Sequence, residues 1–257
     1  RAPWFAPLAQ PGARVAERIA QGASVAAALN DAASSAPDAV PFRFAQQEAL
    51  APAMAYETFI YERRRIPTRD NTHDFFNGLI WLRFPRTKQV FNQWQASAIA
   101  QQGIGAVRGP LRDAITVFDE NGALLIAPPA LRQALRARDW TALGCRLRAN
   151  WQHARLLPFG HALLEKLLQP RKSITAHVYV VDDPTLECAA DVATVDAWMA
   201  AHFQPQPFAA KPFNPLPVLG VPGWWHENEN FCFYDDSFVF RSARRTNTQQ
   251  RDTAAAG

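Results

Sequence analysis

Cysteine is scarce in this sequence of 257 residues, which contains only three. Cys145, Cys188 and Cys232 lie far apart and form no Cys-x-x-Cys pair, which argues against a zinc knuckle or a disulfide framework. Unpaired cysteines are typical of reducing compartments, so we expect a cytoplasmic protein. Long hydrophobic runs are also missing, because the longest uncharged stretch, residues 89–107, is interrupted by Gln, Asn and Ser. Burying those side chains in lipid is costly, and the sequence therefore predicts no membrane partner.

A strong excess of positive charge is missing as well. Lys and Arg number 27 against 23 Asp and Glu, a formal net charge of +4, and several of the arginines lie at or beyond Arg241. The rest of the chain is close to neutral, so we expect nucleic-acid binding to be weak at most. Apolar residues make up 48% and charged residues 19%, which excludes a disordered chain or a coiled-coil rod. We predict one globular domain, residues 1–241, followed by a flexible tail, residues 242–257.

Hydrophobic spacing predicts an α+β fold in which helices dominate. Apolar residues recur with helical spacing in six regions, and Gly or Pro interrupts or ends several of them. The regions are residues 11–36, broken near Gly22; 44–65, interrupted near Pro52; 71–84; 87–102; 129–168, with two or three helices; and 194–203. The first region makes residues 1–40 a helical N-terminal extension of the domain.

A small β-sheet is predicted beside these helices. Residues 114–118 and 123–127 are apolar runs on either side of Asn121-Gly122, which is typical of the turn in a β-hairpin. Residues 174–181 alternate between apolar and polar side chains and predict one further strand. Residues 204–223 are rich in proline, and we expect them to form an extended arm that wraps around the core.

A polar loop, residues 66–71, leads into the most apolar of the predicted helices. Asn71 or Thr72 is expected to cap this helix, and Asp74 lies in its first turn, where a negative charge suits the helix dipole. Apolar residues on nearly every side of the helix indicate that it is buried, and Pro85 ends it.

The loop, this helix and the residues after it carry a recognisable pattern that continues later in the chain. Its parts are Ile66–Asn77, Trp81–Lys88, Arg112–Ala114, Phe118–Glu120, Phe159–Glu165, Asn228–Asn230 and Tyr234–Asp236. In these parts the sequence resembles the bacterial domain-of-unknown-function 3025 family, over about residues 40–241. The resemblance implies no activity, cofactor or partner, because none is established for that family. The chemistry of the chain is therefore argued from its residue types.

His73, Asp74 and Asn77 are the first candidate site residues. The dipole at the start of their helix disfavours a protonated imidazole, and a neutral His73 suits a metal ligand or a general base. Asn77 lies one turn further on, on the same helix face as His73. The alternative is that all three only hydrogen-bond the preceding loop, because Asp and Asn are common caps near the start of a helix.

His161, Glu165 and His177 extend this candidate site. His161 and Glu165 are four residues apart in a predicted helix and share one face, which is also the spacing of an ordinary exposed pair. His177 lies on the polar face of a predicted strand, where it either faces solvent or joins His73 and His161 as a metal ligand. Such a set is typical of zinc or iron. We expect at least three of five side chains to line one concavity: His73, Asp74, His161, Glu165 and His177.

Other charged or polar residues near the motifs are candidates for binding a substrate. Asp235 and Asp236 follow an aromatic run and either line a pocket or form a turn. The basic residues either make an anion-binding rim or belong to a solvated face, and they include Arg171 and Lys172. The substrate-binding candidates are Arg69, Asn77, Arg86, Lys88, Asp235 and Asp236.

Three interpretations stay open. The first is a hydrolase in which His73, Asp74, His161 and Glu165 activate a water, directly or on a divalent metal such as zinc. The second is a module without catalytic activity that binds an anionic partner, either a nucleic acid or a phosphorylated metabolite. In the third, the polar residues only hold the fold together. The sequence leaves the small-molecule ligand, the cofactor and the oligomeric state open.

Overall fold

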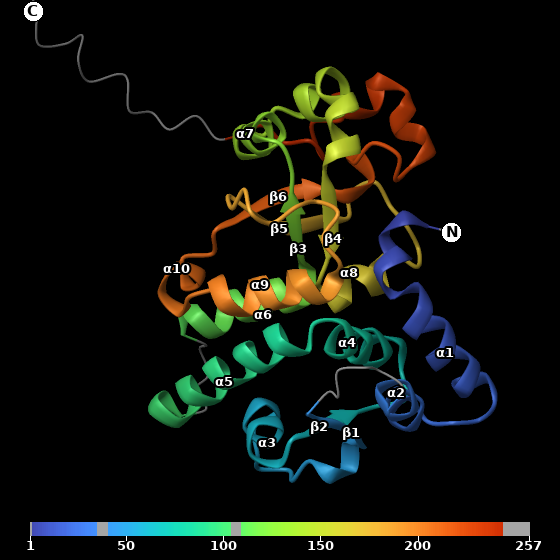
Figure 1. The fold of residues 1–257 in the computed structure, drawn as a ribbon, viewed down its shortest axis with the longest axis vertical. Coiled ribbons are helices and arrows are strands. Elements are labelled where there is room, and N and C mark those ends of the chain that lie inside the picture. The colour runs from blue at the N-terminus through green and yellow to red at the C-terminus, as the bar shows by residue number, and fades with distance from the viewer. Residues whose placement is uncertain (1, 35–40, 104–108, 244–257) are drawn as a thin grey trace, which may run out of the picture.

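Helices surround two small β-sheets in the computed structural model, which describes residues 2–34, 41–103 and 109–243 (Figure 1). The α+β fold class with dominant helices is therefore confirmed. Within the described ranges, no helix combines the length and the apolar character that crossing a membrane requires.

The helices, in chain order, are α1 (Ala9–Ala20), α2 (Val25–Ser34), α3 (Tyr56–Arg63), α4 (Thr72–Arg83), α5 (Pro85–Gln102), α6 (Pro110–Asn121), α7 (Pro129–Ala137), α8 (His161–Lys166), α9 (Val192–His202) and α10 (Pro205–Ala209). The strands are β1 (Arg43–Gln46), β2 (Arg65–Thr68), β3 (Gly122–Ile126), β4 (Arg155–Pro158), β5 (Thr175–Val180) and β6 (Phe213–Pro217). Short single-turn helices fill several of the connections.

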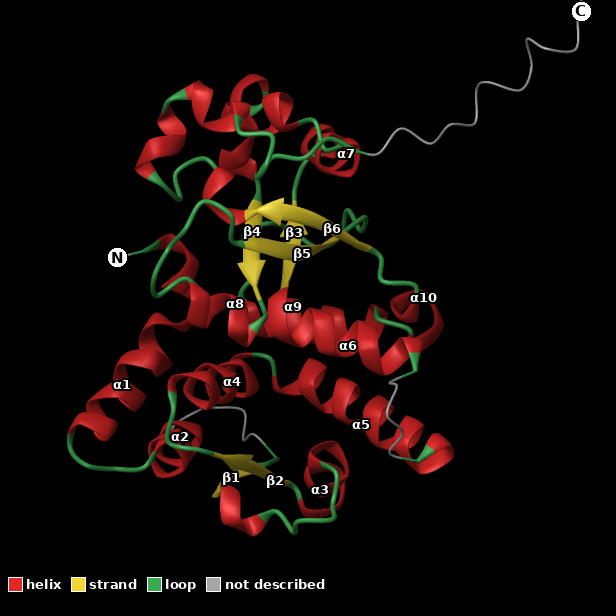
Figure 2. Ribbon diagram, turned by 180° about the vertical axis from the view of Figure 1, so that it is seen from behind, coloured by secondary structure: helices red, strands yellow, loops and turns green. Residues whose placement is uncertain are grey.

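The larger sheet has four strands in the order β4-β3-β5-β6. Its central strand β3 runs antiparallel to β4 and parallel to β5, and it is buried on both faces. Leu124 points into a first cluster of buried side chains shared with α4, α5, α6 and α9, whereas Leu125 points into a second cluster shared with α7. Figure 2 shows the sheet between α7 and the layer of α6, α8 and α9, with α4 and α5 beyond that layer.

The predicted hairpin around Asn121-Gly122 is wrong, because residues 114–118 belong to helix α6. Ala114, Ile115 and Phe118 are fully buried and recur with helical spacing, a pattern that outweighs the preference of Ile, Val and Phe for strands. Gly122 ends α6 and at once begins β3, so the Asn-Gly pair separates a helix from a strand. Strand β3 pairs with β4, which the sequence had assigned to a helical region, and with β5 as predicted for a further strand.

The predicted helix over residues 44–65 is wrong in its first part, where β1 pairs in parallel with β2. The only α-helix in this range is α3, and Gln47–Ala49 form a single 3-10 turn before it. The free edge of β1 is satisfied by Asn30, whose side chain donates to the Phe44 carbonyl at 2.8 Å and accepts from the Phe44 amide at 2.9 Å. These partners lie far away in the sequence, so local spacing carries no signal for them.

The proline-rich arm is more regular than the predicted extended wrap. Residues 204–223 contain helix α10 and strand β6, and β6 pairs with β5 as an edge strand of the larger sheet. Pro215 and Pro217 are tolerated there because an edge strand leaves one side of its backbone unpaired. The predicted break near Gly22 is confirmed between α1 and α2. The predicted tail falls, from residue 244 on, outside the described residues.

A glycine sets the distance between the end of α6 and the start of α8. The Gly160 amide donates to the Gly122 carbonyl at 2.8 Å, so the two chain segments touch through their backbones. A Cβ atom at position 160 would lie 2.5 Å from the Glu120 carbonyl oxygen and 2.6 Å from the Asn121 amide nitrogen. Any larger residue must therefore push His161, the next residue, away from the end of α6.

We expect Gly160→Ala to lower the free energy of unfolding by about 1–3 kcal/mol, the usual cost of overpacking. Urea denaturation measures this change. The matched control is Gly12→Ala in α1, where the added methyl would make an ordinary contact of 3.4 Å with Leu79. The control is expected to leave stability unchanged or to raise it slightly. Equal effects of the two substitutions would contradict the close contact at Gly160.

Candidate functional site

One cavity of about 360 Å³ lies among α3, α4, α5, α6 and the start of α8. It is lined by Gln47, Leu50, Tyr56, Glu57, Ile60, Arg69, His73, Asp74, Asn77, Trp81, Lys88, Phe91, Asn92, Gln95, Thr116, Asp119, Glu120 and His161. Three of the five side chains expected to share a concavity are among them, so that geometric prediction is confirmed. Three of the six substrate-binding candidates line it too.

The start of α4 fixes the loop before it. Asn71 caps the helix, as predicted, by accepting from the Asp74 amide at 2.8 Å. The buried Asp74 carboxylate accepts from the Arg69 amide at 2.6 Å and from two guanidinium nitrogens of Arg69 at 3.0 and 3.1 Å. Both charges are therefore used to close the loop between β2 and α4, and His73 is held beside them.

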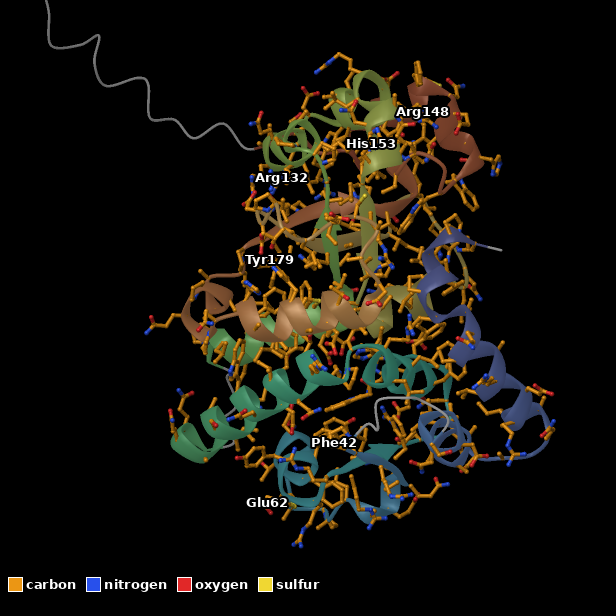
Figure 3. All side chains as sticks on the ribbon, in the orientation of Figure 1. Phe42, Glu62, Arg132, Arg148, His153 and Tyr179 are labelled. Carbon is orange, nitrogen blue, oxygen red and sulfur yellow. The ribbon has the colours of Figure 1, made fainter. Side chains whose placement is uncertain are left out.

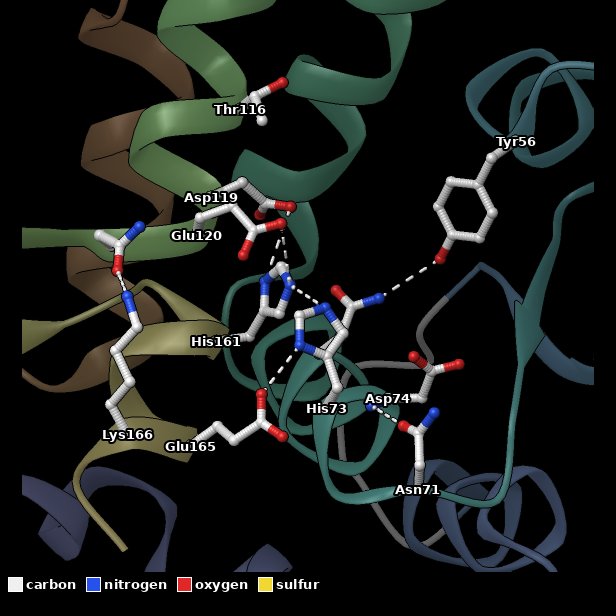
Figure 4. A network of polar contacts seen from close by, with 12 residues as sticks. Tyr56, Asn71, His73, Asp74, Thr116, Asp119, Glu120, His161, Glu165 and Lys166 are labelled. Carbon is white, nitrogen blue, oxygen red and sulfur yellow. Dashed lines mark hydrogen bonds and ion pairs between the residues drawn. The ribbon is translucent and has the colours of Figure 1, made fainter. Parts of the chain in front are cut away.

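Two histidines from distant parts of the chain meet at the cavity. The Nε2 atoms of His73 and His161 are 3.0 Å apart, with the rings nearly perpendicular (Figure 4). His73 Nδ1 lies 2.9 Å from a carboxylate oxygen of Glu165 on α8. Because Glu165 accepts a hydrogen bond, the proton of neutral His73 is assigned to Nδ1, which leaves the lone pair on Nε2. His161 then donates from its own Nε2 to His73.

His161 is almost completely buried, with 5% of its side chain exposed. Burial lowers its pKa from the ordinary 6.5 to about 4, so the ring is neutral near pH 7. Its Nδ1 has no hydrogen-bond partner among the described residues, and the nearest carboxylate oxygen, from Asp119, is 3.7 Å away. A buried ring nitrogen without a partner is uncommon and calls for an explanation.

The last turn of α6 presents two consecutive carboxylates with opposite pKa shifts. Burial would raise the pKa of Asp119, but the Lys88 ammonium, 2.6 Å away, together with His161, lowers it below the ordinary value. For Glu120, burial raises the pKa, and the neighbouring Asp119 charge acts in the same direction against the opposing effect of His73. Asp119 is thus held ionised, whereas Glu120 keeps a proton more readily.

Glu120 joins the two histidines in a cluster with the geometry of a metal site. One ligand atom each from His73, Glu120 and His161 lies within 4.8 Å of the others. Neither Glu120 nor Asp119 was named as a site residue from the sequence, because both fell between the two strands of the predicted hairpin. The helical spacing of α6 was the signal available, because it places both carboxylates at the end of a helix.

Glu165 and His177 have different positions relative to this cluster. Glu165 contacts His73 from outside the cavity lining and is partly exposed. His177 is partly buried on β5, 6.4 Å from the Phe213 ring between centroids, and it is not part of the cluster. Burial lowers the pKa of His177, with smaller effects from two nearby lysines. His177 therefore lies apart from His73 and His161, which instead have Glu120 as their neighbour in the cluster.

The remaining substrate-binding candidates lie away from the cavity. Arg86 is exposed at the start of α5, where its backbone amide donates to Asp196 at 2.9 Å. Asp235 is exposed, and Asp236 forms an ion pair with Lys172 at 3.3 Å. Neither an anion-binding rim at Arg86 nor a pocket at the two aspartates forms next to the histidines.

The buried His161 makes stability depend on pH. Between about pH 6.5 and pH 4 the unfolded chain takes up a proton at this residue and the folded chain does not, so stability falls as the pH falls through this window. From about pH 7.5 to pH 5, we expect metal-free protein to lose about 2 kcal/mol more than the His161→Gln variant does. Urea denaturation at the two pH values measures both losses. Equal losses would contradict the assignment of a neutral His161.

Comparison with known proteins gives a family. Neither a curated protein nor a solved structure matches the chain. A family model does match, over residues 42–244, which include the whole of the cavity lining and all three members of the cluster. The chain therefore belongs to the family described as "Protein of unknown function (DUF3025)".

Proposed function

We propose that this protein is a hydrolase that activates water on a divalent metal ion held by His73, His161 and Glu120. The observation that carries the proposal is the meeting of two imidazole Nε2 atoms, 3.0 Å apart, with a carboxylate in one cavity. Two histidines and one carboxylate are a donor set typical of catalytic zinc or of iron, and three protein ligands leave a position open for water.

The spacing of the two nitrogens fits a shared ion. Zinc binds imidazole at about 2.0–2.1 Å, so two tetrahedral histidine ligands are separated by about 3.3 Å. The 3.0 Å between His73 and His161 needs only a small opening to reach this value. Glu120 Oε1, 3.7 Å from His161 Nε2, is near enough to complete the set without a change of fold.

The unpartnered nitrogen of His161 also supports the proposal. A metal ion needs the lone pair of Nε2, so the proton of His161 must then sit on Nδ1, which faces Asp119 at 3.7 Å. The bound ring would donate to Asp119, just as His73 donates to Glu165. Carboxylates regularly orient the histidines that bind metals. An ion at this site would therefore explain why Asp119 faces a ring nitrogen of His161 that has no hydrogen-bond partner.

The residues around the cluster would assist hydrolysis in defined ways. A divalent ion at this site supplies Lewis acidity and lowers the pKa of bound water towards neutrality. Lys88 holds Asp119 ionised, and Asp119 then fixes the ring of His161. Glu165 fixes the ring of His73 in the same manner. Water adds its oxygen to the electrophilic atom of the substrate, the bond to the leaving group breaks, and one water proton passes to the leaving group.

The alternative of an anion-binding module has less support from the cavity. Arg69 is bound to Asp74 and Lys88 to Asp119, so both basic side chains of the described lining are already paired. If the polar residues had only a structural role, Nδ1 of the buried His161 would be left without a hydrogen-bond partner. A measurement of metal binding distinguishes the proposed hydrolase from these two alternatives.

We expect metal-free wild-type protein to bind one equivalent of Zn²⁺ in isothermal titration calorimetry. His73→Ala, His161→Ala and Glu120→Gln are each expected to abolish this binding, and Glu165→Gln to weaken it by about 10–100-fold, as loss of an orienting partner does. His153→Ala is the matched control, because His153 is exposed and lies at the other end of the molecule from Glu62 of α3 (Figure 3).

Activity is measured on the same proteins with p-nitrophenyl acetate. Zinc-loaded wild type is expected to release p-nitrophenol faster than protein treated with a chelator, and the three ligand variants are expected to show only the rate of the chelated protein. Wild type that binds no divalent ion, or ligand variants that bind it as well as His153→Ala does, would exclude the metal site.

A further inference from the structure

The wall of the cavity contributed by α3 carries a hydroxyl group, Tyr56, whose hydrogen bonding is set by two neighbours. Lys88 Nζ can only donate, and it lies 3.1 Å from Asn77 Oδ1. This contact fixes the orientation of the Asn77 amide, so Asn77 Nδ2 must be the atom that points at Tyr56. Asn77 Nδ2 donates to the Tyr56 hydroxyl oxygen at 3.3 Å, a contact that is visible in Figure 4.

The Tyr56 hydroxyl therefore accepts one hydrogen bond and keeps its own proton for another partner. Among the described residues no acceptor is hydrogen-bonded to this proton, although Tyr56 lines the same cavity as His73, His161 and Glu120. Burial raises the pKa of Tyr56 far above its ordinary value, against the smaller opposing effect of Asn77. Tyr56 is thus a fixed hydrogen-bond donor at neutral pH and not a source of negative charge.

The charges of the lining show which kind of acceptor fits. Its two basic side chains are paired, Arg69 with Asp74 at 3.0 Å and Lys88 with Asp119 at 2.6 Å. Two further carboxylates, Glu57 and Glu120, also line the cavity. The fixed charge is therefore negative, and a divalent ion at the cluster balances it. Beyond the ion, an anionic group would find no unpaired basic side chain in the described lining, whereas an uncharged oxygen needs none.

We infer that the substrate of this site is an uncharged acyl compound, an amide or an ester, whose carbonyl oxygen accepts a hydrogen bond from Tyr56. The inference rests on the proposed hydrolase and narrows its substrate class. In the reaction, the water oxygen forms a bond to the carbonyl carbon, and the bond from that carbon to the amide nitrogen or ester oxygen breaks. The leaving atom takes one water proton. Tyr56 keeps its proton and stabilises the charge that develops on the carbonyl oxygen.

Binding is tested without relying on turnover by labelling the protein with 3-fluorotyrosine. The chain has four tyrosines, and the ¹⁹F resonance that is missing in Tyr56→Phe identifies Tyr56. Zinc-loaded and metal-free protein are titrated with N-methylacetamide and, separately, with inorganic phosphate. We expect the amide to shift the Tyr56 resonance at concentrations where phosphate leaves it in place. If phosphate shifts the Tyr56 resonance as much as the amide does, or if the amide does not shift it, the inference is overturned.

The kinetic test compares Tyr56→Phe with Tyr61→Phe, a tyrosine of the same helix that is 43% exposed. Loss of one hydrogen bond to the carbonyl oxygen is expected to lower kcat/KM for p-nitrophenyl acetate about tenfold in Tyr56→Phe, with unchanged zinc content. Tyr61→Phe is expected to match wild type. Faster turnover of p-nitrophenyl phosphate than of the acetate would overturn the inference while leaving the metal-dependent hydrolase intact.

The two proposals can fail separately. If the amide shifts the Tyr56 resonance but the protein hydrolyses no ester, the inferred hydrogen bond to a carbonyl oxygen stands and the hydrolase is excluded. A protein that hydrolyses the acetate with zinc but shows equal rates in Tyr56→Phe and Tyr61→Phe would keep the hydrolase and remove the role of Tyr56.

Discussion

The buried ammonium group of Lys88 connects most of the polar groups in the cavity. It comes from α5 and lies against the Trp81 ring, at 5.2 Å from the ring centroid, with only 7% of the side chain exposed. From there it contacts Asp119 on α6 and Asn77 on α4. A charge in such a place is tolerated only with partners of this quality. Helices α4, α5 and α6 are therefore held together at one point, and this contact fixes the orientation of the side chains around it.

Two consequences of this arrangement reach the opposite sides of the cavity. On one side, the ionised Asp119 faces Nδ1 of the buried, neutral His161 at 3.7 Å. On the other side, the oriented amide of Asn77 determines how the Tyr56 hydroxyl bonds. One ion pair thus orients groups at both of the proposed sites, the metal cluster and the Tyr56 hydroxyl.

The parts of the fold that depend on local chemistry were predictable from the sequence. The cap at Asn71 and the buried helix after it follow from side chains within a few residues of one another. The approach of His73 to His161 was expected from the motifs around them, although no local pattern proves such a contact. The strand alternation at His177 was read correctly, but its face of the sheet turns to Phe213 and not to the other histidines.

Two of the errors share one physical cause, which is pairing over long distances in the sequence. The parallel pair β1–β2 and the edge strand β6 are each stabilised by a strand that the local sequence does not reveal. The hairpin error has a local cause, because the strand preference of residues 114–118 was given more weight than their helical spacing. It had the largest effect on the site, because it hid Glu120. Once residues 110–121 are taken as a helix, the two carboxylates follow from its last turn.

The two histidines of the cluster are 88 residues apart in the chain, and Glu120 lies between them. Bringing such distant points together costs conformational entropy, which grows slowly with the length of the loop. Here the sheet and the contact at Gly160 hold α8 against α6 through backbone hydrogen bonds and apolar packing. These contacts already offset the entropy of bringing the two histidines together, so an ion at the proposed site would not have to organise the chain around it.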